Sequence, residues 1–74
     1  MGLGEKIYAL RTDKGMSQTD LAEALDVSRQ SISKWETNAS IPELDKLLKM
    51  SEIFGISLDF FPIPNIMKEN DIMR

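Results

Sequence analysis

The sequence predicts an all-α domain, a compact bundle of about five short helices. Apolar residues recur three and four positions apart along most of the chain, which is the spacing of one helix face. Serine, glycine and proline stand where these stripes begin and end. No alternating apolar and polar run of useful length occurs, and the β-branched residues are scattered, so no strand is expected. A chain of 74 residues allows one small domain.

The first helix is expected over residues 3–13. Gly15 should end it, because glycine adopts the left-handed cap conformation without strain. A helix this short is not stable alone in water, so its apolar face must be buried against other helices. That face consists of Leu3, Ile7 and Leu10, with Tyr8 as a further candidate.

Two more helices should follow, separated by a short turn. Ser17-Gln18-Thr19-Asp20 is a capping pattern that predicts the start of a helix over residues 18–25. Ser28 is the next N-cap candidate and predicts a helix over residues 29–36. The apolar residues expected on the buried faces of these two helices are Leu21, Ala22, Leu25, Ile32 and Trp35.

A fourth helix is expected to hold Pro42 in its first turn, where a missing N–H costs nothing. The segment Asn38-Ala39-Ser40 before it is turn-like, and Gly55 should cap its end. Its inner face is expected to carry Leu44, Leu47, Leu48, Ser51 and Phe54.

A last short helix is expected to start at Ser57 and to carry Leu58 and Phe61. Two prolines then follow close together and cannot continue a helix. The compact domain is therefore expected over residues 1–61, with residues 62–74 as a C-terminal tail.

The composition counts against catalysis. The chain has twelve acidic and nine basic residues, a formal charge of −3, and neither cysteine nor histidine. No disulfide, thiolate nucleophile or cysteine metal site is expected, and the most common general base is also missing. Paired carboxylates such as Glu5 with Asp13, or Asp20 with Glu23, more often serve solvation and capping on exposed helix faces. We expect no enzyme, no cofactor and no metal site.

Neither a secretory signal nor a membrane span is expected. The N-terminus has no apolar run of signal-peptide length, and no stretch approaches the roughly 18 apolar residues of a spanning helix. The lack of cysteine fits a reducing compartment. The chain is therefore expected to be cytoplasmic.

The candidate functional motif lies in residues 17–36, where two short helices and their turn match a helix-turn-helix. Ala22 is small where the helices would cross, and Val27 is apolar just inside the turn. With Ile32 and Trp35 buried, the outward face of the second helix is rich in hydrogen-bond donors. Such side chains can read guanine and adenine in the major groove, although an ordinary solvated helix face is also polar. The outward residues are Ser28, Arg29, Gln30, Ser31, Ser33 and Lys34.

Four segments of the chain carry a more specific pattern. In order, they are Gly15-Met16-Ser17-Gln18-Thr19-Asp20-Leu21-Ala22, Val27-Ser28-Arg29-Gln30-Ser31-Ile32-Ser33-Lys34-Trp35-Glu36, Ile41-Pro42 with Leu44 and Leu47-Leu48, and Gly55-Ile56-Ser57-Leu58-Asp59. Over about residues 3–61 they resemble the phage repressor and Cro family, also called the XRE family. The resemblance implies a lambda-repressor-like DNA-binding domain of bacterial or phage origin. The family often has glycine in the motif turn where this chain has Asp26, and aspartate tolerates the left-handed conformation better than most residues.

The resemblance also implies residue roles. Gln18 sits where family members contact a phosphate and sometimes brace a recognition-helix side chain. Arg11 and Glu36 match a partly buried ion pair that ties the first helix to the third. Breaking such a pair is costly even where its net contribution is small, so Arg11 is assigned to the scaffold. The base-reading positions are Ser28, Arg29, Gln30, Ser33 and Lys34, and the phosphate-contacting positions are Ser17, Gln18, Ser31 and Asn38.

The acidic charge is unevenly distributed. Residues 1–26 hold five acids and three bases, residues 27–40 hold one acid and two bases, and residues 41–74 hold six acids and four bases. Because binding follows the local field, the net charge does not argue against DNA. It predicts weak non-specific affinity, since few phosphates are neutralised.

We therefore expect a sequence-specific regulator of transcription, most simply a repressor, that binds a double-stranded DNA operator as a homodimer on two-fold related half-sites. One alternative is a protein-binding module that reads no DNA, and an antitoxin that binds both a toxin and its own operator would combine the two roles. Dimerisation is expected through Phe60 and the tail residues Ile63, Ile66 and Met67. The alternative for the tail is a disordered segment or a linker.

Overall fold

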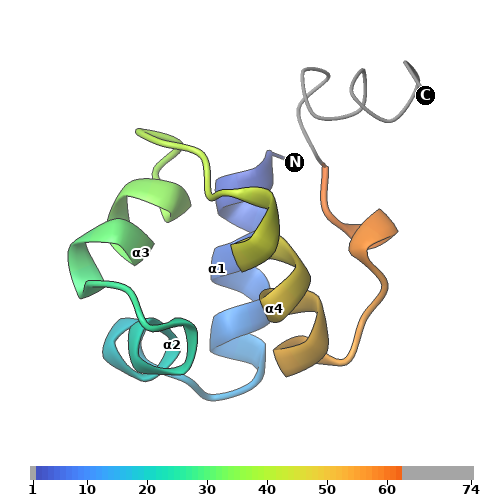
Figure 1. Ribbon diagram of the computed structural model, residues 1–74, viewed down its shortest axis with the longest axis horizontal. Coiled ribbons are helices and arrows are strands. Elements are labelled where there is room, and N and C mark those ends of the chain that lie inside the picture. The colour runs from blue at the N-terminus through green and yellow to red at the C-terminus, as the bar shows by residue number, and fades with distance from the viewer. Residues whose placement is uncertain (1, 63–74) are drawn as a thin grey trace.

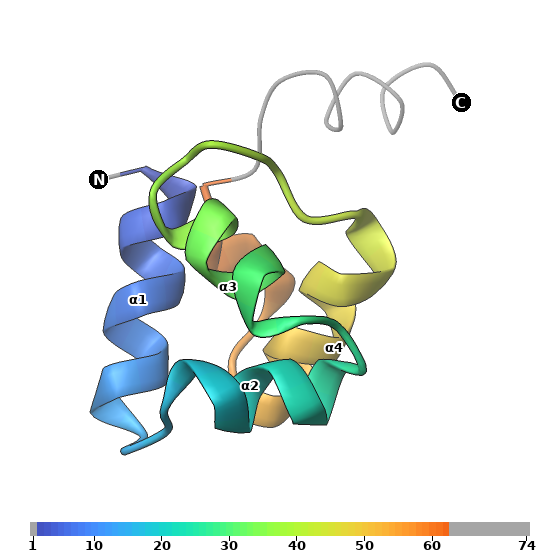
Figure 2. The same ribbon diagram turned by 90° about the vertical axis from the view of Figure 1, so that its left-hand side faces the viewer.

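The computed structural model describes residues 2–62. Its elements are α1 (Leu3–Asp13), α2 (Gln18–Leu25), α3 (Arg29–Glu36), α4 (Leu44–Phe54) and a short 3-10 helix, η1 (Leu58–Phe60). The described residues contain no strand, which confirms the all-α class. Figure 1 shows α4 in front of α1 with α3 to the left, and Figure 2, turned by 90°, shows α3 foremost with α1 and α4 on its two sides.

Serine side chains fix the starts of α2 and α3. The Ser17 hydroxyl accepts from the backbone N–H of Asp20 at 3.0 Å, and the Asp20 carboxylate accepts from the N–H of Ser17 at 3.0 Å. The N–H and the hydroxyl of Ser17, both hydrogen-bonded to Asp20, lower the pKa of that carboxyl. Ser28 accepts from the N–H of Ser31 at 3.1 Å. Each serine satisfies a backbone donor that the first helical turn leaves free, and the expected bounds of both helices are confirmed.

Each of the four α-helices in the described residues is followed by a left-handed residue, which after α3 is Asn38 with φ of 63°. Gly15 follows α1 with φ of 75°, Asp26 follows α2 with φ of 57°, and Gly55 follows α4 with φ of 68°. Aspartate thus occupies the left-handed position in the motif turn, as expected. The last turn of α2 gains a further partner, because the Lys46 ammonium donates to the backbone carbonyl of Leu25 at 3.1 Å. This bond ties α4 to the motif turn.

One hydrophobic core holds the helices together. Ile7 from α1, Leu21 from α2 and Ile32 from α3 are fully buried with Leu47 and Met50 from α4. Met50 was not expected in the core, although it lies three residues after Leu47 and therefore on the same helix face. The remaining buried apolar residues are Leu3, Ala22, Leu25, Trp35 and Phe61.

The expectation for α4 was wrong in two respects. The helix begins at Leu44 rather than at Pro42, because Glu43 is extended and Pro42 is buried in the preceding loop. Leu44 and Leu48 are not on the inner face, since each is 46% exposed. Apolar residues occupy more of this helix than the core can cover, and periodicity alone does not say which edge of a wide stripe faces inward.

Two smaller expectations also need correction. Tyr8 is exposed on α1 and does not belong to the buried stripe. The last helix is a single 3-10 turn whose N-cap is Ser57, and Phe61 packs into the core just after it. Phe60, by contrast, is exposed. The tail residues Ile63, Ile66 and Met67 lie outside the described residues.

A candidate nucleic-acid interface

Helix α3 lies on the surface with one face buried and one face free. Ile32 and Trp35 anchor it, and it packs against α1 and α2. Figure 2 shows it as the foremost helix of that face. The opposite face carries a shallow hollow lined by Arg29, Gln30, Ser33 and Lys34. These four side chains therefore share one accessible surface, as the sequence predicted.

The free face of α3 carries positive charge. Arg29 and Lys34 are exposed on it. The only acid of α3 is Glu36, and its side chain, 5% exposed, is turned inward toward Arg11. The acid of this segment is thereby removed from the surface that the two cations occupy.

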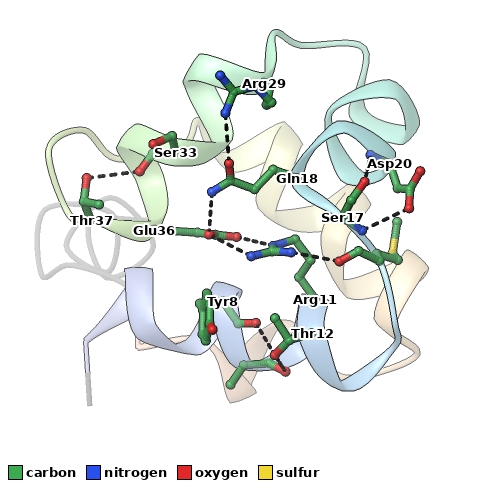
Figure 3. A network of polar contacts seen from close by, with 12 residues as sticks. Tyr8, Arg11, Thr12, Ser17, Gln18, Asp20, Arg29, Ser33, Glu36 and Thr37 are labelled. Carbon is green, nitrogen blue, oxygen red and sulfur yellow. Dashed lines mark hydrogen bonds and ion pairs between the residues drawn. The ribbon is translucent and has the colours of Figure 1, made fainter.

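Glu36 and Arg11 form a buried, two-pronged ion pair (Figure 3). The Arg11 Nε donates to Glu36 Oε2 at 2.6 Å, and Nη2 donates to Oε1 at 3.2 Å. Arg11 Nη1 also donates to the backbone carbonyl of Met16 at 2.8 Å. No buried side-chain nitrogen or oxygen among the described residues lacks a partner. The pair therefore joins α1, α3 and the loop before α2 without an unsatisfied group, as burial of charge requires.

Gln18 extends this network to the surface (Figure 3). Its Nε2 donates to Glu36 Oε1 at 3.0 Å, and its Oε1 accepts from Arg29 Nη1 at 3.3 Å. The carboxylate of Glu36 can only accept, so the Gln18 amide must direct its nitrogen inward and its oxygen outward. The outward oxygen thus accepts from Arg29, one of the four side chains on the free face of α3.

Residues 7–61 match the sequence model described as helix-turn-helix. The chain belongs to the phage repressor and Cro-like helix-turn-helix family. It is 42% identical over 59 residues to the HTH-type transcriptional activator BcrR of Enterococcus faecalis, which covers 80% of this chain and 29% of that protein. It is 42% identical over 57 residues to the prophage-derived regulator YonR of Bacillus subtilis, covering 77% and 53%. The chain thus spans about half or less of the length of these relatives.

Solved helix-turn-helix structures share the fold. The regulator SinR in complex with DNA gives a TM-score of 0.71 at 30% identity, covering 78% of this chain and 94% of that one. The P22 c2 repressor with a synthetic operator gives a TM-score of 0.76 at 32% identity, covering 81% and 91%.

Asn38, expected at a phosphate, is engaged with the start of α1 in this helix-turn-helix domain. Its Oδ1 accepts from the backbone N–H of Gly4 at 3.0 Å, and its Nδ2 donates to the Glu5 carboxylate at 3.2 Å. This side-chain hydrogen bond is the main cause that lowers the pKa of Glu5. Asn38 has a left-handed backbone, with φ of 63°, which aspartate and asparagine tolerate best after glycine.

The expected serine contacts lie at helix starts. Ser17 is the N-cap of α2, and Ser31 lies in the first turn of α3 behind its N-cap, Ser28. The Ser28 and Ser31 hydroxyl oxygens lie 3.1 Å apart.

Sequence reasoning missed Gly4. A Cβ at this position would lie 2.5 Å from the Trp35 carbonyl oxygen and 2.6 Å from that of Glu36. The first turn of α1 therefore packs directly on the C-terminal end of the recognition helix. A glycine in a first helical turn is a weak signal, and nothing else in the sequence points to this contact.

Between residues 2 and 62, no group of three or more acidic residues is placed to hold a metal ion. No helix in the same part of the chain has the length and hydropathy needed to cross a bilayer.

Proposed function

We propose that this chain is a sequence-specific, double-stranded DNA-binding regulator of transcription that inserts α3 into the major groove. The observation that carries the proposal is the free face of α3, where Arg29, Gln30, Ser33 and Lys34 line one surface and Glu36 is paired inward. A recognition helix needs such a face of donors without an interposed acid.

Each outward side chain has a role that its chemistry suggests. Arg29 and Lys34 donate to guanine O6 and N7, and Gln30 pairs with adenine N6 and N7. Ser28 and Ser33 add hydroxyl contacts to base edges. Ser17 and Ser31 contact phosphates at the two helix starts, which positions the module without reading sequence.

Gln18 and Asn38 are weaker candidates for phosphate contacts than the serines. The Gln18 nitrogen and the Asn38 nitrogen already donate to Glu36 and Glu5, so each has one further hydrogen for a phosphate oxygen. A nearby carboxylate also disfavours a phosphate, because both are anions.

The chain acts as a homodimer, because one short module makes few contacts and two-fold operators present two half-sites. Residues 1–61 form the DNA-binding unit, and exposed Phe60 with Ile63, Ile66 and Met67 contributes to dimerisation. Repression by occlusion is the simplest mode in a bacterial or phage-infected cytoplasm. BcrR carries the name of an activator, so activation is the alternative mode.

Selection of bound duplexes from a random pool at stated salt tests the proposal. We expect a motif with two-fold related half-sites about one helical turn apart. Arg29→Ala should weaken binding to the selected duplex by about 1–3 kcal/mol and relax preference at one position in each half-site. Lys14→Ala, a change of an exposed cation beyond the end of α1, is the matched control. Failure to enrich any motif would refute sequence-specific binding.

A further inference from the structure

Lys46 of α4 reaches across to the end of α2. It is half-buried, and its ammonium donates at 3.1 Å to the backbone carbonyl of Leu25, the last residue of α2. The carbonyls of a last helical turn have no intrahelical partner and form the negative end of the helix dipole. The last turn of α2 has no basic residue of its own. Lys46 therefore supplies, from another helix, the cation that this helix end lacks.

A lysine at position 46 does not suit its own helix. It lies in the first turn of α4, two residues after Leu44, where the helix begins. A cation is disfavoured there, because the first turn is the positive end of the dipole. Asp45, the acid of the same turn, has the charge that this end prefers. The favourable partner of the Lys46 ammonium is thus the end of α2.

The turn that follows α2 is itself unfavourable in two respects. Asp26, the C-cap of α2, has a left-handed backbone with φ of 57° and ψ of 46°, which is costly for residues other than glycine. Its carboxylate is exposed at the negative end of α2, where an anion is disfavoured. The N–H groups of Asp26 and Val27 donate to carbonyls inside α2 at 3.2 and 2.9 Å. The bond from Lys46 adds to these local bonds a partner from another helix.

The same turn sets where the recognition helix begins. Residues 26–28 separate α2 from α3, and Ser28 is the N-cap of α3. The carbonyl that Lys46 holds is therefore close in sequence to Arg29, the first residue of α3. Figure 2 shows this turn beside α4, with α3 starting from it. The C-terminal end of α3 packs on Gly4 of α1, so α1 holds one end of the recognition helix and α4, through the turn, holds the other.

We propose that Lys46 is a positioning residue for DNA recognition. By holding the end of α2 against α4, it fixes the start of α3 and with it the reach of Arg29 and Gln30 into the groove. The inference rests on the proposed DNA-binding function. Hydrogen bonds to base edges need donor–acceptor distances of roughly 2.7–3.2 Å, and a binding site tolerates displacements of only about 0.5 Å. Release of the turn from α4 should therefore weaken base reading in a domain that still folds.

Lys46→Met tests this role, because methionine keeps an unbranched side chain but has no hydrogen to donate. Competition between the selected duplex and duplexes changed at the base read by Arg29 measures discrimination. We expect Lys46→Met to lower it about fivefold, the lower end of what one base contact contributes. Lys46→Arg keeps a cationic donor and should discriminate as the wild type does. Lys49→Met, the same change at an exposed lysine of α4, is the matched control and should have no effect.

The same measurement separates positioning from stability. It is made at a temperature at which circular dichroism shows each variant to be folded. Wild-type discrimination by folded Lys46→Met would overturn the proposal even if the Tm of the variant were lower, because the lysine would then contribute to stability alone.

If Lys46→Met does not fold, the comparison is made in an Asp26→Gly background. Glycine adopts a φ of 57° without strain and removes an anion from the end of α2, so this change should stabilise the turn. Within this background, Lys46→Met should again lower discrimination about fivefold. Equal discrimination with and without Lys46→Met would overturn the proposal.

Amide hydrogen exchange in the free protein separates this inference from the proposed function. The N–H groups of Val27 and Ser31 form hydrogen bonds at the end of α2 and the start of α3, and Lys46→Met should speed their exchange about tenfold. The N–H of Thr37, bonded to Ser33 at the other end of α3, is the internal control and should exchange at the wild-type rate.

The exchange results and the DNA results together identify which idea fails. An equal increase at all three amides would indicate a general loss of stability and would overturn the inference. If the wild type selects a duplex and Lys46→Met changes neither exchange nor discrimination, the inference fails alone. If exchange rises only at Val27 and Ser31 but the wild type selects no duplex, the proposed function fails, while the contact between Lys46 and α2 is supported.

Discussion

Both the nitrogen and the oxygen of the Gln18 amide are hydrogen-bonded within the domain, which fixes the orientation of the amide. Its nitrogen donates to Glu36 and its oxygen accepts from Arg29. The resemblance implied two roles for Gln18: a phosphate contact, whose loss would weaken all sequences alike, and bracing of a recognition-helix side chain. We propose that the second role applies here, because the hydrogen bond to Arg29 limits the rotamers of a long side chain that would reach one base.

Gln18→Leu should therefore relax base preference more than it weakens binding overall. Leucine fills a similar volume but provides neither hydrogen bond. We expect discrimination at the base read by Arg29 to fall by about 1–3 kcal/mol, the value of one good bidentate contact. Competition between the selected duplex and single-base variants measures this. A uniform loss over all duplexes would instead assign Gln18 to a phosphate.

The negative charge of Glu36 balances the buried guanidinium of Arg11 in the same network. Glu36→Gln keeps the shape but leaves the Arg11 guanidinium buried without a counter-charge, a change that typically costs about 3–5 kcal/mol. Because small domains are stable by only about 5–15 kcal/mol, urea unfolding should show a large shift of the midpoint. Glu52→Gln, on the exposed side of α4, should stay within about 0.5 kcal/mol. Equal stability of the two variants would mean that the ion pair contributes nothing.

The contact between α1 and α3 depends on the absence of a side chain at Gly4. A Cβ there would lie 2.5 Å from the Trp35 carbonyl oxygen and 2.8 Å from Asn38 Oδ1. The first is a backbone atom, which cannot move unless α3 moves with it. The recognition helix is thus seated on the first turn of α1 at its C-terminal end, while Ser28 fixes its N-terminal end.

Gly4→Ala should destabilise the domain although alanine is the better helix former. The propensity gain is about 1 kcal/mol, but forcing a methyl group into a filled space typically costs about 1–3 kcal/mol. Gly2→Ala is the matched control, because a Cβ there would come close only to the end of the flexible Glu5 side chain, at 2.7 Å, with Asn38 Nδ2 at an ordinary 3.7 Å. Thermal unfolding followed by circular dichroism compares the two. A higher Tm for Gly4→Ala than for the wild type would show that the helices separate at no cost.

Helix α4 shows where sequence patterns stop being sufficient. Serine caps act within one turn, so the starts of α2 and α3 could be predicted from local residues. The core-facing edge of α4 is set by residues distant in sequence, since Leu47 and Met50 belong to one buried cluster with Leu21 and Ile32. The sequence therefore predicted Leu44 and Leu48 in the core, whereas both lie at the surface. Met50 was overlooked for the same reason.

The candidate site also has one part that the sequence predicts and one part that it does not. The outward residues of α3 could be predicted, because burial of Ile32 and Trp35 fixes which side of a single helix is free. The engagement of Asn38 with α1 could not, since it joins residues 34 positions apart through a left-handed turn. Local helix geometry thus predicts which residues of α3 face outward, while contacts between distant segments decide how each side chain is held.

The domain as a whole is acidic, and the free face of α3 carries few basic residues. Arg29 and Lys34 are the two basic residues of residues 27–40, in a chain of formal charge −3. Affinity should therefore depend weakly on salt and strongly on base contacts, unlike that of a basic DNA-binding protein.

Salt titration of DNA binding tests this expectation. Arg29 and Lys34 are assigned to base edges, so log K against log salt should have a shallow slope, of at most about −2 per half-site even if each also neutralises one phosphate at ~0.9. Lys34→Ala should reduce the slope by no more than about 1, whereas Lys14→Ala, outside the proposed interface, should leave it unchanged. Fluorescence anisotropy at several salt concentrations gives each slope. A slope several times steeper would mean that phosphates are contacted by basic residues beyond α3.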